Sequence, residues 1–261
     1  MISINVTNPT SASGTILLGT QKLAFTGAIS PNIAGNQRLT TSILRKGKTA
    51  LTLVIDIDTS RWVGRATGTL AGDGDTLEFT AWKNLWDGKA NPATAYVGYY
   101  TSSLLPTIGD ETFPQGYGYL TWTATTAGVV TFTGKAADGS ALTGSTYLWP
   151  DGQMPFFLQL YKATGALGGM VSINGNRAVS GALNWAKKPQ ITPPLPRDYK
   201  EGFSGAIVKV EGGPWLAPAS GQILLGLADV PDNARLDFAR GDVESASQFA
   251  DLDQVLRITK A

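Results

Sequence analysis

The chain has 261 residues, with no Cys, no His and 21 basic against 20 acidic side chains. The missing residue types exclude disulfide bonds, thiolate nucleophiles, zinc sites built from Cys or His, and Ser-His-Asp relays. A net charge of +1 argues against a nucleic acid or an anionic membrane surface as partner. We therefore expect no nucleic-acid binding, no membrane insertion and no cofactor in a chain whose 43% hydrophobic residues suffice for a folded core.

Along the chain, short stretches alternate apolar and polar residues, which is typical of β-strands with one exposed face. Residues 51–57, 119–123 and 129–133 are clear examples. Turn-forming Gly and Asp-Gly pairs recur about every ten residues and include residues 72–75 and 138–139. Short strands joined by tight hairpins form antiparallel meanders.

One stretch near the C-terminus departs from this pattern. Between residues 243 and 255, Phe249, Leu252 and Val255 have the spacing of a helix face. A helix and a strand both remain open for this segment. The rest of the chain predicts an all-β fold of antiparallel meanders, which must curl into barrel-like or sandwich-like layers to bury their apolar faces. One large barrel and two small ones are both compatible with the pattern.

An internal repeat organises the chain. Residues 12–19 return as residues 219–226, which lie 207 positions further on, and a middle copy begins at Gly118. The offset predicts repeats of about 104 residues, and it makes Trp82 and Trp185 copies of one packing residue. The predicted parts are a first β-meander repeat over residues 1–95, a second over residues 96–190, and a Pro-rich linker with a partial third repeat over residues 191–261. We expect the partial repeat to complete the fold with the N-terminal strands.

Four motifs of the second repeat belong together. They are Gly-Tyr-Gly-Tyr-Leu-Thr at residues 116–121, Phe-Thr-Gly-Lys-Ala-Ala-Asp-Gly at 132–139, Asp-Gly-Gln-Met-Pro at 151–155 and Gly-Ala-Leu-Asn-Trp at 181–185. From about Val97 to Phe203, this set resembles the repeated β-rich module of very large secreted or surface proteins of verrucomicrobial-type bacteria. The resemblance implies an extracellular or cell-surface protein with a structural or adhesive role, and it supplies no catalytic residue. Residues 1–5 lack the charged and apolar regions of a signal peptide.

Aromatic residues are the best candidates for ligand binding. Flat Trp and Tyr rings can stack on the apolar faces of sugar rings without any titrating group. Trp62, Trp86 and Trp149 have no obvious counterparts in the other repeats, and Tyr117 adds to the aromatic residues of the central region. We predict these four as ligand-binding residues, with packing in the core or between repeats as the alternative for each.

Paired carboxylates are the remaining route to hydrolysis without His or Cys. Asp56 and Asp58 lie two residues apart and project from the same face of a strand. Both stand at the end of that strand, where solvated carboxylates are expected, so we predict no catalytic residue. Residues 72–75 offer carboxylates for Ca²⁺ but lack the further ligands of a calcium loop, which favours a hairpin turn and no metal site.

The predicted function is that of a non-enzymatic extracellular structural or adhesive β module that self-assembles by pairing open β-edges. A carbohydrate-binding module with exposed Trp and Tyr is the first alternative. An outer-membrane β-barrel, with alternating strands of about ten residues, and a carboxylate-pair glycosidase are weaker alternatives. The expected partners are further copies of the chain, a cell-surface protein or a glycan.

Overall fold

The structure is a computed structural model of the whole chain. It describes residues 1–18, 21–31, 36–58, 64–107, 109–190, 193 and 199–215, and the backbone of 221–227, 230–239 and 242–248. Every strand pair in these residues is antiparallel, so the predicted all-β meander fold is confirmed. Two single-turn 3-10 helices, η1 (Thr94–Tyr96) and η2 (Tyr161–Ala163), interrupt the strands. No helix in the described ranges is long and apolar enough to cross a membrane.

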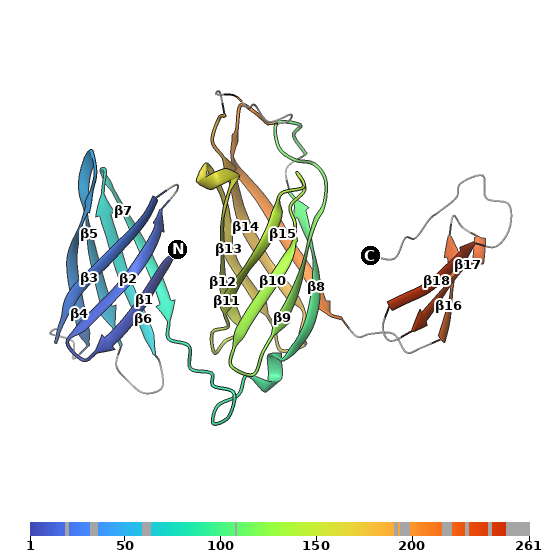
Figure 1. Cartoon of the computed structure of the whole chain (residues 1–261), viewed down its shortest axis with the longest axis horizontal. Coiled ribbons are helices and arrows are strands. Elements are labelled where there is room, and N and C mark those ends of the chain that lie inside the picture. The colour runs from blue at the N-terminus through green and yellow to red at the C-terminus, as the bar shows by residue number, and fades with distance from the viewer. Residues whose placement is uncertain are drawn as a thin grey trace. The chain divides into compact units, whose positions relative to one another are not determined.

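The first sheet is a seven-stranded meander in which each strand pairs with its neighbours in the chain and the sheet curls into a half-barrel (Figure 1). Its strands are β1 (Ile2–Asn8), β2 (Ser11–Leu18), β3 (Gln21–Pro31), β4 (Gln37–Arg45), β5 (Lys48–Ile57), β6 (Arg65–Gly72) and β7 (Asp75–Trp82). The alternation in β5 works as predicted, because Leu51, Leu53 and Ile55 are buried while Thr52 is exposed. These side chains form the centre of the first core.

The predicted hairpin turn at residues 72–75 is confirmed. Gly72 pairs with Asp75 at the ends of β6 and β7, which leaves Asp73 and Gly74 as the two turn residues. Both have positive φ, 56° and 87°, as a two-residue turn between right-handed twisted strands requires. Glycine meets this requirement without steric cost, and Asp tolerates it better than most residues.

The second sheet has eight strands and forms a nearly closed barrel (Figure 1). Its strands are β8 (Gly98–Pro106), β9 (Gly118–Ala124), β10 (Val129–Lys135), β11 (Ala141–Tyr147), β12 (Gln153–Leu160), β13 (Gly165–Ile173), β14 (Val179–Lys187) and β15 (Phe203–Pro214). β15 pairs with both β14 and β8, which joins the last strands of the meander to its first. At the remaining seam, between β11 and β12, the Thr146 hydroxyl donates to the Pro155 carbonyl at 2.5 Å.

The strand pairing extends beyond the predicted division at residue 190, because β15 completes the sheet that begins at β8. The chain divides after Pro214 into two compact units, Met1–Pro214 and Trp215–Ala261. In the second unit, β16 (Gly221–Leu227), β17 (Val230–Ala239) and β18 (Asp242–Gln248) pair with one another. β18 settles residues 243–248 of the ambiguous segment as strand, and residues 249–255 lie outside the described residues.

Candidate functional site

Trp86 is a packing residue of the eight-stranded barrel. It lies in the segment between β7 and β8, and its indole Nε1 donates to the Leu148 carbonyl at 2.9 Å. The ring is half-buried and makes an edge contact with Tyr96, at a centroid distance of 6.0 Å. The hydrogen bond and the ring contact favour the packing alternative for Trp86 over a ligand-binding role.

The other predicted aromatic residues do not form one site with it. Trp149 is half-buried and packs against Trp82, with ring centroids 5.8 Å apart. Tyr117 is 77% exposed and precedes the start of β9. Trp149 follows Leu148, whose N–H donates to Gly128 beyond the other end of β9, so Tyr117 and Trp149 lie at opposite ends of the barrel. Trp62 lies outside the described residues.

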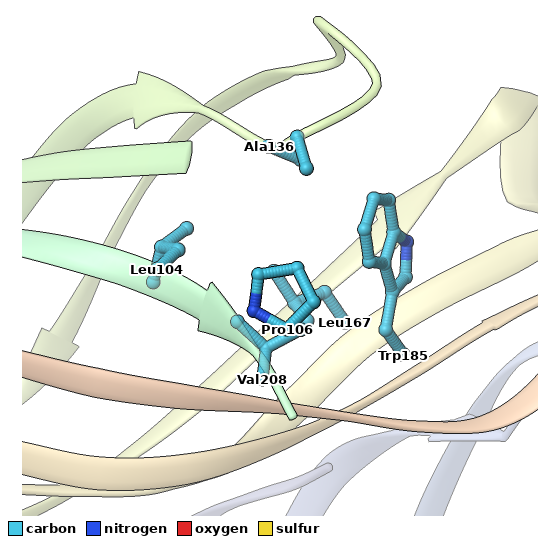
Figure 2. A pocket seen from close by; sticks show the side chains of 7 residues that line it. Leu104, Pro106, Ala136, Leu167, Trp185 and Val208 are labelled. Carbon is cyan, nitrogen blue, oxygen red and sulfur yellow. The ribbon is translucent and has the colours of Figure 1, made fainter. Parts of the chain in front are cut away.

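A small cavity lies at one end of the eight-stranded barrel (Figure 2). The side chains that line it are apolar: Leu104, Pro106, Ala136, Ala137, Leu167, Trp185 and Val208. Its volume is about 10 Å³, which is room for about one water molecule. Figure 2 shows the indole nitrogen of Trp185 on the far side of the ring from Leu104 and Pro106. The cavity is therefore a packing gap rather than a ligand pocket, which would hold hundreds of cubic ångströms.

A polar cluster in the same barrel ties one loop to the sheet. The Tyr161 hydroxyl donates to Asp138 Oδ2 at 2.5 Å, and Lys187 Nζ lies 5.0 Å from the centroid of the Tyr161 ring. Burial and the hydrogen bond to Asp138 raise the pKa of Tyr161, so its hydroxyl stays a proton donor. Tyr161 and the next two residues have positive φ, and the cluster holds this costly turn in place.

Sequence reasoning interpreted Asp138 as a turn residue and did not single out Tyr161 or Lys187. The interpretation of Asp138 is correct as far as it goes, because its other carboxylate oxygen accepts from the Ser140 N–H at 2.9 Å. The contact with Tyr161 spans 23 positions, and no local pattern encodes it. The cluster has a structural role, since the Tyr161 hydroxyl bonds to the Asp138 carboxylate and the Lys187 ammonium lies over the Tyr161 ring.

Asp56, one member of the carboxylate pair considered from sequence, forms an ion pair with Arg38. Asp56 accepts two hydrogen bonds from Arg38, from Nε and from a terminal nitrogen, each at 2.7 Å. Arg38 and Asp56 face each other across β4 and β5, so the side chain that sequence reasoning considered for hydrolysis links two strands. The described part of the chain contains no group of three His, Cys, Asp or Glu residues that would hold a metal ion.

The open edges of the seven-stranded sheet are the most distinctive surface of the molecule. Among the described residues, β1 pairs only with β2 and β7 only with β6. Val6 faces the buried Ala12 across β1 and β2, and Leu77 faces the buried Leu70 across β7 and β6. Facing residues project from the same side of a sheet, so Val6 and Leu77 point toward the core. They are nevertheless 50% and 52% exposed.

In the eight-stranded sheet, the strand that corresponds to β1 is paired on both sides. β8 is the first strand of its meander, as β1 is of the other, and β15 pairs with its second edge. Tyr100 and Leu104 on β8 are fully buried as a result. β1 has no such neighbour in the described structure, which leaves backbone donors and acceptors and apolar side chains at one edge.

Comparisons of the chain with protein-family models, with curated proteins and with solved structures find no match. The candidate site is therefore defined by its geometry, as the open edge formed by β1 and the core-facing side chains along it.

Proposed function

We propose that the protein is a non-enzymatic structural or adhesive β module that works at the cell surface or outside the cell and self-assembles by pairing β-edges. The observation that carries this proposal is the open edge of β1, with Val6 half-exposed on the core side. An unpaired edge offers a row of N–H and C=O groups to another strand, and proteins that must stay monomeric usually protect such edges. The resemblance at residues 116–185 supports the cell-surface location.

The test of self-assembly is the mass of the purified chain as a function of concentration. Sedimentation or light scattering should show reversible association between micromolar and near-millimolar concentrations, because a single edge contact is weak. A Tyr117→Ala variant is the control, since Tyr117 is 77% exposed beside β9 of the eight-stranded sheet and should leave the association unchanged. A chain that remains monomeric over the whole range contradicts the proposal.

A carbohydrate-binding module is the second candidate, and the outer face of the eight-stranded sheet favours it. Thr101, Thr121, Thr133 and Thr143 stand in register across β8, β9, β10 and β11. Tyr119, which is 51% exposed, lies beside this row on β9. Hydroxyls and an exposed ring are groups that bind and stack on sugars.

Glycan binding on an array is the test of this second function. Binding that is lost in Tyr119→Ala with an unchanged circular dichroism spectrum would support the outer face. Loss in Trp149→Ala instead would support the site predicted from sequence. An absence of binding to every glycan on the array contradicts a carbohydrate-binding role and does not affect the self-assembly proposal.

A further inference from the structure

The backbone of β1 presents its free hydrogen-bonding groups at alternate residues. The Leu17 N–H donates to the Met1 carbonyl at 2.8 Å, and the Met1 amino group donates to the Leu17 carbonyl at 3.0 Å. Pairs that exchange hydrogen bonds alternate with pairs that do not along an antiparallel ladder. Ser3 and Asn5 therefore direct their backbone N–H and C=O groups to β2. Ile2, Ile4 and Val6 direct theirs to the open side.

The alternation of apolar and polar residues over positions 2–6 of β1 is the same in both directions. Residues 2–6 read Ile-Ser-Ile-Asn-Val. Two antiparallel copies centred on Ile4 place Ile4 opposite Ile4, Ile2 opposite Val6 and Ser3 opposite Asn5. The apolar pairs then share the core-facing side and the polar pairs share the outer side. Centres at Ser3 or Asn5 match fewer apolar residues.

The distribution of charged residues also favours self-pairing through β1 over self-pairing through β7. β1 carries no Lys, Arg, Asp, Glu or Pro, the residues that proteins use to block edge pairing. β7, the other edge of the sheet, carries Asp75 and Glu78. Two copies that met through β7 would bring carboxylates of like charge together, whereas two copies that meet through β1 oppose no charges.

We propose that β1 pairs antiparallel with β1 of a second copy of this chain, in the register centred on Ile4, and so joins two seven-stranded sheets into one. This inference rests on the proposed function, because it names the edge and the register of the self-assembly. In this register, Ile2, Ile4 and Val6 use the backbone groups that are free on the open side, and each facing pair exchanges two hydrogen bonds.

The size of the contact makes it weak. A stable interface covers about 800 Å² per partner, and one pair of short strands covers much less. The contact is suited to molecules held at high local concentration, where a second linkage multiplies its effect. Disulfide cross-linking, which captures a weak contact covalently, is therefore the most sensitive test of the β1–β1 pairing.

The sequence contains no Cys, so a disulfide can form only between cysteines that are introduced at chosen positions. Ser3 and Asn5 are exposed and face each other between copies at a pair without hydrogen bonds, where the Cα atoms lie about 4.5 Å apart. A mixture of Ser3→Cys and Asn5→Cys chains under mild oxidation should give a disulfide-linked heterodimer. Each variant alone should give little dimer, because identical positions lie diagonally, about 7–8 Å apart.

Other cross-linking patterns overturn the proposal. Efficient homodimers of Ser3→Cys or of Asn5→Cys would show a different register. A cross-link between Ser3→Cys and Thr80→Cys, which lies on β7, would show that copies join head to tail. No cross-link in any mixture, with association of the unmodified chain intact, would place the self-assembly elsewhere and leave the proposed function standing. No cross-link and no association would contradict both.

An Ile4→Pro variant gives an independent test in the same full-length chain. Its lost N–H faces the open side, so β1 keeps its hydrogen bonds to β2, and proline is accepted at such edge positions. The dissociation constant of the self-association should rise about tenfold or more, while Ile4→Val keeps it. Should Ile4→Pro not fold, Val6→Pro provides the same loss at a half-exposed position. Unchanged association in a folded proline variant overturns the proposal.

Discussion

The guanidinium of Arg45 forms two hydrogen bonds to the carboxylate of Asp73, at 2.7 and 2.8 Å. Arg45 ends β4, and Asp73 stands in the turn between β6 and β7, so the pair joins two hairpins of the seven-stranded sheet. The Thr49 hydroxyl donates to the same carboxylate at 2.9 Å. The Arg45 side chain is buried, and the Asp73 carboxylate compensates the cost of burying its positive charge.

The Arg45–Asp73 pair predicts an acid-dependent loss of stability. The hydrogen bond from Arg45, and then that from Thr49, lower the pKa of Asp73 from 3.8 to about 2. A carboxylate with a depressed pKa stabilises the folded state above its unfolded pKa, and this contribution is lost as the pH falls from 3.8 through about 2. Asp73→Asn should be less stable at neutral pH and should lose less stability over that acid range, as measured by urea unfolding at a series of pH values.

The control for this experiment is Asp75→Asn. It removes a negative charge from the same hairpin and leaves the Arg45 pair intact, so the acid-dependent loss should persist. Equal pH profiles for Asp73→Asn and the unmodified chain would refute the assigned role of the pair.

Tyr161→Phe should destabilise the eight-stranded barrel by about 1–3 kcal/mol, because the Asp138 carboxylate loses a hydrogen bond in a partly buried place. The phenyl ring keeps the contact with Lys187, so the change isolates the hydroxyl. Urea unfolding of Tyr161→Phe, Asp138→Ala and the double variant forms a double-mutant cycle. Additive losses in the cycle would show that the hydroxyl and the carboxylate do not interact.

Gly128→Ala should cost more stability than Gly139→Ala. Both glycines have positive φ, 70° and 82°, so both substitutions carry a backbone cost of about 1–2 kcal/mol. A Cβ at Gly128 would also collide with the Trp86 ring, whereas a Cβ at Gly139 would meet nothing within 4 Å. The collision should add about 1–3 kcal/mol. Thermal or urea unfolding measures the difference, and equal losses would mean that Trp86 does not pack there in solution.

Leu53→Ala and Leu77→Ala compare the closed and open parts of the half-barrel. Leu53 is fully buried in β5, and its loss should cost about 2–5 kcal/mol. Leu77 faces the core from the β7 edge but is 52% exposed, so its loss should cost about 1 kcal/mol or less. Urea unfolding of the monomer gives both values. A large cost at Leu77 would indicate that another segment covers the β7 edge.

Local features of the fold were predictable from sequence because the signals that encode them are local. The alternation at residues 51–57 and the Gly and Asp residues at 72–75 led to β5 and to the β6–β7 hairpin. The pairing of β15 with β8 was not predictable, because Val208 meets Pro106 across about a hundred residues and many strands in this chain share the same alternation. The predicted repeat of about 104 residues and the extracellular location remain predictions.

The candidate site illustrates the same limit. A Trp ring can stack on a ligand or on a neighbour, and only the position of Leu148, 62 residues further along the chain, shows that Trp86 packs. The apolar alternation of β1 was visible in the sequence, but its open edge depends on which strand pairs with which. The sequence therefore predicts pairing through an open strand edge but does not identify β1 as that edge.

The place of β15 sets the order in which the two sheets can be completed during synthesis. Each pairing in the seven-stranded sheet joins consecutive strands, so this sheet can form step by step as the chain leaves the ribosome. The eight-stranded barrel must wait for Phe203–Pro214, because that strand alone joins β14 to β8. Until it arrives, Tyr100 and Leu104 lack their cover, and such half-built strands are the ones most exposed to mispairing with neighbouring chains.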